Sequence, residues 1–333
     1  MKACKFLGPV LSLILVGCLV ACGQKASQGS KQKIDFILDW SPNTNHTGLY
    51  VAKEKGYFKE AGLDVDIKLP PEDSTSDLII NGQAPLGIYF QDSMAKKLEK
   101  GAEITAVAAL VEHNTSGIIS KKSADIKGPK NLAGKRYGTW NDPIELGMIK
   151  TLLESQGADF KQLEKVPNTD SNSTTPIENG LFDAAWIYYG WDGLMAQSQK
   201  METNFFYMRD YVPEFDYYSP VIIANNDYLK KHKEEAKKLL QAIKKGYQYA
   251  MDHPEEAADM LIKNAPELKS KRDFVLESQK YLSKEYAQKK ENWGHFDAKR
   301  WNAFYQWAKN NGLIEKDLTD KGFTNEFIKD DKN

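Results

Sequence analysis

The sequence predicts an α/β fold, and two observations support this prediction. From residue 33 onward, short apolar runs alternate with longer stretches of helical periodicity, which is the pattern of sheets covered by helices. Short strings also recur about one hundred residues apart, which predicts two related α/β units. "DFILDW" ends at Trp40 and "KRYGTW" at Trp140, "GIYF" with Tyr89 recurs as "WIYY" with Tyr188, and Asn-Gly pairs fall at 81–82 and 179–180.

The expected elements follow from the apolar runs and from the turn residues that bound them. Strands are expected at 33–40, 63–69, 85–90, 104–111, 116–122, 136–140, 163–168 and 181–189, and a returning segment at 219–229. Helices are expected at 47–58, 74–83, 93–101, 143–157 and 174–180, and the chain beyond 229 is expected to be mostly helical. "WNAFYQWA", starting at Trp301, has aromatic residues at helical spacing and predicts a helix packed into the core.

Composition limits the classes of function. The chain has 333 residues, 41% of them hydrophobic, which is long enough for two domains. It has 45 Lys and Arg against 46 Asp and Glu, and no basic stripe. Nucleic acid is therefore not an expected partner.

The N-terminus has the pattern of an export signal. Lys2 and Lys5 precede the apolar run "FLGPVLSLILVGCLVA", which is too short and too early for a spanning helix. The following "LVAC" resembles a bacterial lipobox, which implies cleavage before Cys22 and attachment of a lipid to its thiol. An ordinary signal peptide with a chance cysteine is the alternative. We expect a lipoprotein signal peptide at 1–21 and a lipidated Cys22 with a flexible tether at 22–32.

Cysteine use narrows the chemistry further. Cys4, Cys18 and Cys22 all lie in the N-terminal segment, so the exported body has no disulfide, thiol nucleophile or cysteine metal ligand.

Aromatic residues follow the expected strands at corresponding places in the two units. Ligands of open α/β sheets bind beyond the carboxyl ends of the strands. Trp40 and Tyr89 would face the site from one unit, and Trp140 with Tyr188 and Tyr189 from the other. The sequence thus predicts an aromatic cleft between two lobes.

Three segments resemble a known family of solute-binding proteins. They are "GLYVAKEKGYFKEAGLDVDI", "LAGKRYGTW" and "IENGLFDAAW", and they are similar to segments of the taurine, alkanesulfonate and thiamin-precursor receptors and of a related yeast pyrimidine synthase. The resemblance spans residues 33 to 263. "GQAPLGI" departs from the family's Gly-x-x-Asp-x-Gly at Pro85, which puts one loop near the cleft in doubt.

The resemblance implies a two-lobed periplasmic-binding-protein fold of type II with two crossovers. The first lobe would comprise 33–117 and 219–333, and the second 118–218. Hinges are expected near 116–120 and 217–222, with the C-terminal helices returning to the first lobe.

Within the family, "DWSPNTNHTGLYVA" and "YYGWDG" are most similar to ThiY-type receptors for thiamin-precursor pyrimidines, formylaminopyrimidine or hydroxymethylpyrimidine. Such a ring needs flat faces for stacking and complementary groups at its edges. Asp39, Glu112 or Asp192 would accept from the amine, and Asn43, Gln91 or Asn114 would satisfy a ring nitrogen. A sulfonate would instead favour arginine, and the body has four: Arg136, Arg209, Arg272 and Arg300.

His46 has two interpretations. A lone histidine is commonly a packed or capping residue, but its polar turn beside Trp40 also suits a ligand contact. The other histidines, His113, His232, His253 and His295, show no metal-type spacing with it, so no metal site is expected.

The alternative interpretation of His46 is that the protein is an enzyme and His46 is its reacting histidine. The yeast branch builds the pyrimidine from pyridoxal phosphate and its own histidine, using iron and a cysteine-rich run, and His46 matches that histidine. The exported body has no cysteine for such a run.

The aromatic cluster "AWIYYGWDG" is also ambiguous. Trp186 is expected to be partly structural, whereas Tyr188, Tyr189 and Trp191 follow the apolar start of the strand and are cleft candidates. Tyr217 or Tyr218 on the return crossover is a further candidate.

The sequence therefore predicts a lipid-anchored, extracytoplasmic binding protein of an ABC importer, without catalytic activity or cofactor. Its partners would be a small pyrimidine, the permease subunits and, through the anchor alone, the membrane; a monomer is expected. The alternatives are a receptor for a sulfonate, a riboflavin-like ring or another heteroaromatic compound, and a surface adhesin that uses the same fold.

Overall fold

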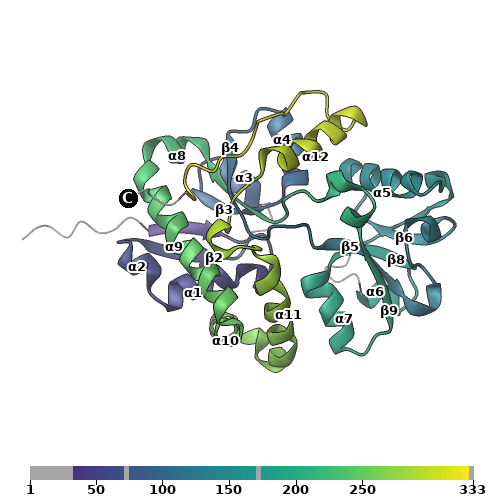
Figure 1. Cartoon of the computed structure of the whole chain (residues 1–333), viewed down its shortest axis with the longest axis horizontal. Helices are drawn as coiled ribbons and strands as arrows, with labels where there is room; N and C mark the ends of the chain where they lie inside the picture. Colours follow the sequence, from purple (N-terminus) through teal and green to yellow (C-terminus); the bar gives the residue numbers. More distant parts are fainter. Residues whose placement is uncertain (1–32, 71–74, 170–173, 330–333) are drawn as a thin grey trace, which may run out of the picture. The chain divides into compact units, whose positions relative to one another are not determined.

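The described chain contains two five-stranded sheets with the same strand order. The computed structural model describes residues 33–70, 75–169 and 174–329. The first sheet has the order β2-β1-β3-β10-β4 and the second has the order β7-β6-β8-β5-β9 (Figure 1). The strands are β1 (Lys33–Ile37), β2 (Asp64–Lys68), β3 (Leu86–Tyr89), β4 (Ile104–Ala109), β5 (Ser116–Lys121), β6 (Arg136–Thr139), β7 (Glu164–Pro167), β8 (Ala184–Tyr188), β9 (Thr203–Tyr207) and β10 (Val221–Asn225).

Each sheet has four strands that run in one direction and one antiparallel strand that the chain contributes as it passes between the sheets. β1 is parallel to β2 and β3, as β6 is to β7 and β8. β10 is antiparallel to β3 and β4, and β5 is antiparallel to β8 and β9. The repeat predicted from short strings is thus confirmed as a repeat of topology.

The recurring Asn-Gly pairs end equivalent helices. Gly82 (φ 67°) and Gly180 (φ 73°) both adopt left-handed backbone conformations, and their N–H groups donate to Ile79 and Ile177 at 3.1 Å in each case. Glycine is the usual residue where a helix ends in this conformation, since it has no Cβ to clash.

The helices lie where apolar periodicity predicts them, with two additional breaks. The expected helix at 47–58 divides at Gly56, which has a φ of 78°, and the long C-terminal helical run divides before Pro254. The helices are α1 (Thr47–Glu54), α2 (Tyr57–Glu60), α3 (Thr75–Ile80), α4 (Gln91–Glu99), α5 (Pro143–Ser155), α6 (Thr174–Glu178), α7 (Leu194–Ser198), α8 (Asn226–Lys231), α9 (Lys233–Asp252), α10 (Pro254–Asn264), α11 (Arg272–Glu285) and α12 (Ala298–Asn310).

Lobe 1 is the first sheet with α1–α4 and α8–α11, and lobe 2 is the second sheet with α5–α7. The chain crosses between them at 110–115 and 208–220. The first expected hinge, 116–120, lies inside β5 and not in a crossover. β9 was not predicted, because its "TNFFY" lacks flanking turn signals and is recognised only by its pairing with β5.

The C-terminal helix α12 is a core element that contacts both lobes. Trp301, Phe304 and Tyr305 are buried, as the aromatic spacing predicts. On the lobe 2 side, the Trp307 indole donates to Thr151 of α5 at 3.3 Å.

Candidate ligand-binding cleft

A groove of about 660 Å³ is lined by both lobes and runs from the carboxyl end of β3 along α3 and α4, with Lys96, Lys97 and Lys100 of lobe 1 among its lining residues. Lobe 1 contributes Tyr89 from the end of β3 and Asp92 from the first turn of α4. Lobe 2 contributes Asp142 and Ile144 at the start of α5. The carboxyl end of β3 belongs to the edge at which open α/β sheets bind ligands.

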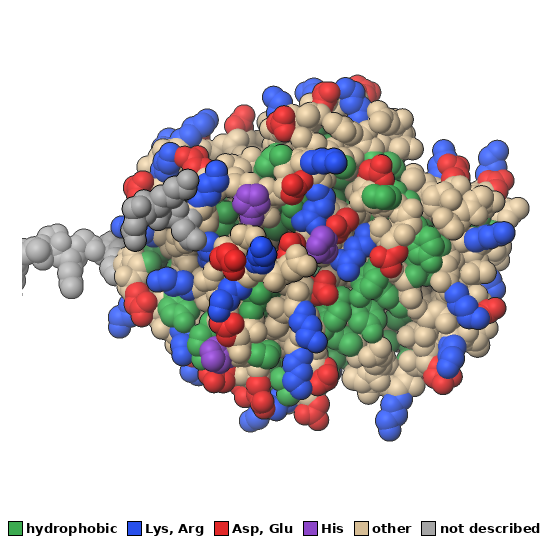
Figure 2. Space-filling model, in the orientation of Figure 1, with side chains coloured by type: hydrophobic (Ala, Val, Ile, Leu, Met, Phe, Trp, Pro, Cys, Tyr) green, Lys and Arg blue, Asp and Glu red, His purple; other side chains and the backbone are tan. Residues whose placement is uncertain are grey.

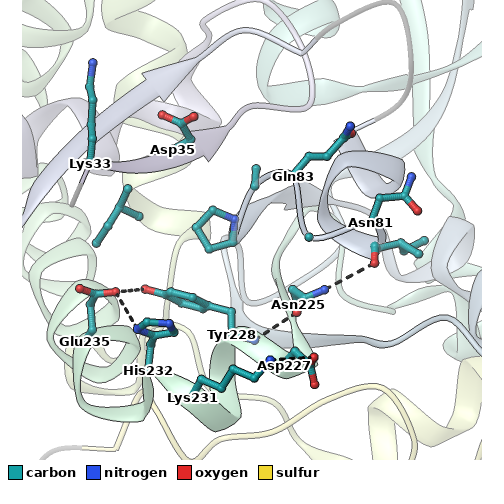
Figure 3. Close-up of a pocket in the computed structure, with 15 residues that line it drawn as sticks. Lys33, Asp35, Asn81, Gln83, Asn225, Asp227, Tyr228, Lys231, His232 and Glu235 are labelled. Atoms are coloured by element: carbon teal, nitrogen blue, oxygen red, sulfur yellow. Dashed lines mark hydrogen bonds and ion pairs between the residues drawn. The ribbon is translucent and has the colours of Figure 1, made fainter.

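A second cavity of about 500 Å³ lies at the opposite ends of the lobe 1 strands (Figure 3). Its side chains pair with one another: Glu235 accepts from the Tyr228 hydroxyl at 3.1 Å and lies 3.7 Å from His232. Pro85 lines this cavity, so the departure from the family pattern lies away from the cleft and not beside it. With Tyr228, His232 and Glu235 paired and no residue from lobe 2, this cavity is the weaker candidate.

The two strand-end tryptophans are exposed. Trp40 follows the strand β1 and Trp140 follows β6, and their exposed fractions are 47% and 50%. Trp140 also contacts the Trp186 ring, with 5.7 Å between centroids. Large exposed rings at equivalent strand ends provide faces on which a flat ligand can stack.

Glu145 holds the backbone beside Trp140. Its carboxylate accepts from the Tyr137 hydroxyl at 2.9 Å, the Thr139 hydroxyl at 2.8 Å and the Trp140 N–H at 3.1 Å. Burial raises the pKa of Glu145, while these hydrogen bonds oppose the rise. The sequence signal was the capping box that Asp142 and Glu145 form at the start of α5.

The turn after β1 is held by a buried histidine. His46 has no exposed surface, and its Nδ1 accepts from the Asn43 N–H at 3.2 Å. An acceptor Nδ1 requires the proton on Nε2, which therefore donates to Asp39 at 2.7 Å. The Asn43 side chain caps the same turn through Asn45. Of this turn, Asp39 and Trp40 retain groups that can face a ligand, and Asn43 and His46 have structural roles.

Asp92 was missed by the sequence analysis and has the most unusual environment in the cleft. Its Oδ2 accepts from the Tyr217 hydroxyl at 3.3 Å, while its Oδ1 is buried without a hydrogen-bond partner. Burial raises the pKa of Asp92 to about 6, and Asp142 across the groove adds to the rise. Its position directly after the β3 strand end was the available signal.

Tyr188 of lobe 2 contacts both the second crossover and lobe 1. Its hydroxyl lies 2.9 Å from the Ser219 hydroxyl on the second crossover, and its ring stacks with Phe90 of lobe 1 at 6.4 Å and 22°. Burial raises the pKa of Tyr188, and the carboxyl groups of Asp92, Asp39 and Asp192 raise it further. The Tyr188 hydroxyl therefore lies among acidic groups.

Further unpartnered polar atoms come from β5 and β8. Ser116 pairs with Tyr188 and Ile118 with Trp186 in the antiparallel register, so these four side chains share one face of the sheet. The Ser116 Oγ and the Trp186 Nε1 are both buried without a partner. Buried polar atoms are normally satisfied, so these two atoms are available for hydrogen bonds to a ligand.

Gln91 and Tyr218 are bonded inside lobe 1 instead of facing the cleft. The Gln91 amide donates to the Trp301 carbonyl at 2.9 Å and accepts from the Tyr218 N–H at 2.8 Å. The Tyr218 hydroxyl accepts from the Asp297 N–H at 2.7 Å, and its ring lies under the Arg300 guanidinium. The Gln91 amide and the Tyr218 hydroxyl thus both have partners within the protein. These side chains were expected to contact the ligand, and here they connect parts of the fold.

Glu112 and Asn114 lie on the first crossover. Glu112 accepts from the Gln288 N–H, which ties the crossover to the segment after α11. Asn114 accepts from the Ser116 N–H at 2.8 Å through Oδ1. Its Nδ2 lies near the Tyr217 hydroxyl, where it opposes the rise of the pKa of Tyr217, but it does not meet the geometry of a hydrogen bond. Asn114 thus retains a donor for a ligand, whereas the Glu112 carboxylate is bonded to the Gln288 N–H.

Tyr189 and Trp191 contact α11 of lobe 1. They lie in a π-helical turn, Tyr189–Gly193. The Tyr189 ring is 5.4 Å from Tyr281, and the Trp191 ring is 4.7 Å from Phe274. Figure 2 shows hydrophobic side chains gathered between α11 and the second sheet. These two rings join the lobes at the side of the cleft instead of lining its floor.

Asp192 belongs to the same turn but points back toward Tyr188. Its Oδ2 accepts from the Tyr188 N–H at 3.3 Å, and burial raises the pKa of Asp192 to about 6.

The described residues show neither a metal-binding group nor a membrane-spanning helix. Within 33–70, 75–169 and 174–329, no three His, Cys, Asp or Glu residues are grouped to hold a metal ion. In the same ranges, every helix is too short or too polar to cross a membrane. Cys22 lies outside the described residues.

Comparisons with known proteins agree with this architecture. The family model described as NMT1/THI5 like matches residues 43–257. The formylaminopyrimidine-binding protein of Halalkalibacterium halodurans is 27% identical over 326 residues, which cover 95% of this chain and 96% of that protein. The 4-amino-5-hydroxymethyl-2-methylpyrimidine phosphate synthase THI5 of Saccharomyces cerevisiae is 26% identical, over 90% of this chain and 88% of that enzyme.

Among solved structures, the ligand-binding component of an ABC-type import system from Staphylococcus aureus, with zinc bound, superposes with a TM-score of 0.68. It is 14% identical and the match covers 91% of this chain and 99% of that one, so the likeness is one of fold. The chain has the two-lobed periplasmic-binding-protein fold and belongs to the NMT1/THI5-like family.

Proposed function

We propose that this protein is the extracytoplasmic solute-binding lipoprotein of an ABC importer and binds a thiamin-precursor aminopyrimidine, formylaminopyrimidine or hydroxymethylpyrimidine, between its lobes. The observation that carries the proposal is a set of buried polar atoms without partners: Asp92 Oδ1 from lobe 1, and Ser116 Oγ and Trp186 Nε1 from lobe 2. Each such atom costs about 1–3 kcal/mol. A polar ligand that satisfies them would recover this free energy and favour the closed arrangement of the lobes.

The rings around these atoms suit a flat ligand. Phe90 of lobe 1 and Tyr188 of lobe 2 are close to parallel across the cleft, and the Trp40 and Trp140 faces are exposed. Offset stacking adds about 0.5–1.5 kcal/mol to the burial of a ring. The ligand set that we propose is therefore Asp39, Trp40, Tyr89, Phe90, Asp92, Asn114, Ser116, Trp140, Trp186, Tyr188 and Asp192.

The relative from Halalkalibacterium halodurans supports the ligand class, since its similarity extends over almost the whole chain. The groups around Tyr188 support it as well. The carboxyl groups of Asp39, Asp92 and Asp192 act on Tyr188 and would repel a sulfonate placed beside its hydroxyl, whereas Lys96, Lys97 and Lys100 line the groove along α4. The closed form would then dock on the permease, with the crossovers at 110–115 and 208–220 serving as hinges.

Synthase activity fits this chain less well. The resemblance to the yeast branch places the reacting histidine at His46. In this structure His46 has no exposed surface, and both ring nitrogens are bonded to Asn43 and Asp39. A histidine in that position holds the turn, and a reaction at its ring would require the turn to open.

Isothermal calorimetry tests the ligand. The body from residue 24 onward would be unfolded and refolded to remove carried-over ligand, then titrated with formylaminopyrimidine, hydroxymethylpyrimidine, thiamin and taurine. We expect saturable one-to-one binding of a pyrimidine that Trp40→Ala weakens strongly. Heat with taurine alone would support the sulfonate receptor, and tolerance of both Trp40→Ala and Tyr188→Ala would support an adhesin.

Fractionation of cells tests the anchor. The full chain should sediment with membranes, and Cys22→Ser should release it to the soluble fraction because the thiol that accepts the lipid is gone. Cys18→Ser is the matched control and should remain with membranes. Equal distribution of the two variants would contradict lipidation of Cys22.

A further inference from the structure

The unpartnered oxygen of Asp92 points to a rule of ligand selection that deepens, and rests on, the proposed function. We propose that Asp92 selects the ligand by an exocyclic amino group: Oδ1 accepts an N–H of that group, so that the cleft binds an amino-heterocycle and rejects the corresponding oxo-heterocycle.

The two oxygens of Asp92 have different surroundings. Oδ2 accepts from the Tyr217 hydroxyl, which fixes the orientation of the carboxyl group. Oδ1 has neither a partner nor exposed surface. Asp92 lies in the first turn of α4 and lines the interlobe groove, so a group that binds between the lobes would reach Oδ1 once the lobes part to admit it. Asp92 thus provides one acceptor, Oδ1, whose orientation is fixed and which has no hydrogen-bond partner in the protein.

Among the described residues, Asp92 forms no ion pair, although Lys96, Lys97 and Lys100 line the same groove. Lys96 and Lys97, one turn further along α4, pair with Glu99 at 3.2 Å and Asp77 at 2.6 Å. From lobe 2, Asp142 and Tyr188 act on the carboxyl group electrostatically, and Tyr305 does so from α12. Acidic and phenolic groups therefore surround it, and the backbone N–H groups of Ser93 and Asp92 oppose the rise of its pKa.

An ionised carboxylate can accept hydrogen bonds but cannot donate one. An amino group supplies the matching donor, whereas an oxo group would place a second acceptor against Oδ1. Sites built around a specific hydrogen bond reject analogues that cannot make it much more strongly than apolar pockets reject a methylene.

The other unpartnered atoms have the opposite polarity. The Trp186 Nε1 and the Asn114 Nδ2 can only donate, and the Ser116 hydroxyl can do either. A ring that offers an amine toward Asp92 and acceptors, such as a ring nitrogen or a hydroxyl or formyl oxygen, toward lobe 2 would satisfy both sets. An aminopyrimidine has this arrangement.

The test compares two ligands in matched variants by calorimetry at pH 7.5. The full-length chain, purified in detergent, would be titrated with 4-amino-5-hydroxymethyl-2-methylpyrimidine and with its 4-oxo counterpart. We expect the wild type to prefer the amino compound by about tenfold or more. Asp92→Asn should lose or invert that preference, because its amide can donate to the oxo group. Asp227→Asn, on the exposed face of α8, should keep the wild-type preference.

The outcomes separate the inference from the proposed function. If the wild type binds both compounds equally, or if Asp92→Asn keeps the wild-type preference, Asp92 does not select the amine, and the pyrimidine receptor stands. If the wild type binds neither compound, the proposed function and the inference both fail. The ratio of the two affinities in the wild type can contradict the inference without any variant. The test therefore holds even if Asp92→Asn folds poorly.

Discussion

The hydroxyl groups of Tyr207 and Tyr281 lie 2.8 Å apart and join β9 of lobe 2 to α11 of lobe 1. Beside them, Ser278 of α11 donates to the Gly190 carbonyl of lobe 2 and lies 2.5 Å from the Thr44 hydroxyl of lobe 1. Helix α11 therefore bridges the lobes along one side of the cleft through paired polar groups. Such contacts exist when the lobes are together and are lost when they separate.

Tyr281→Phe should weaken ligand binding without reaching the ligand. It removes one hydroxyl of the bridge, and a typical hydrogen bond contributes about 0.5–1.5 kcal/mol. We expect the dissociation constant to rise by about two- to tenfold, and small-angle scattering of the free protein to show a larger radius of gyration. Tyr249→Phe, whose hydroxyl bonds Glu256 within lobe 1, is the control. Equal effects of the two variants on binding would contradict a role for α11 in closure.

His46→Ala should destabilise the fold. It removes the acceptor of the Asn43 N–H and the donor to Asp39, and it leaves a cavity at a position with no exposed surface. Each unsatisfied group costs about 1–3 kcal/mol, so we expect the free energy of unfolding to fall by about 2–5 kcal/mol in urea denaturation. His295→Ala, at an exposed position, should change it by less than about 0.5 kcal/mol. A stable His46→Ala protein that fails to bind would instead indicate direct ligand contact.

The buried carboxyls Asp92 and Asp192 should make the stability of the free protein depend on pH. Burial raises the pKa of each to about 6, above the value of about 3.9 in an unfolded chain. The folded state then binds the proton more tightly, so the contribution to stability is present below about pH 4 and is lost as the pH rises through about 6.

Replacing either carboxyl group removes the free-energy cost of ionising it in the folded protein at neutral pH. Relative to the wild type, Asp92→Asn should have a free energy of unfolding that is about 1–2 kcal/mol larger at pH 7.5 than at pH 5, so that the variant gains stability as the pH rises. Chemical denaturation at the two pH values measures the difference. If the variant and the wild type differ by the same amount at both, the carboxyl titrates alike in the folded and unfolded chains.

Gly246→Ala should disrupt the packing of α9 on α1. A Cβ atom at Gly246 would lie 2.0 Å from the Gly48 carbonyl oxygen, a backbone atom that cannot move without shifting α1. We expect the free energy of unfolding to fall by about 1–3 kcal/mol or more, measured by thermal denaturation. Gly147→Ala is the matched helical control: its Cβ would meet the flexible end of Leu313, and helix propensity favours alanine by about 1 kcal/mol. A smaller loss for Gly246→Ala than for Gly147→Ala would contradict this account.

The sequence alone predicted the α/β class, the repeat and the places of most strands and helices. These features depend on periodicity and on local turn residues such as Gly82 and Gly180, whose conformations are set within a few residues of the chain. For the same reason it predicted that Trp40 and Trp140 stand at equivalent strand ends. The short β9 was missed because its only support is a partner strand, β5, some eighty residues earlier.

The tertiary structure decided which polar groups are open to a ligand. Gln91 had the right chemistry, but the Tyr218 N–H, 127 residues away, occupies its amide oxygen. Asp92, one residue further along, keeps a free oxygen because Tyr217 bonds the other one. Whether a side chain is consumed by the fold or left for a ligand depends on partners brought together from distant parts of the chain, and local sequence patterns do not contain that information.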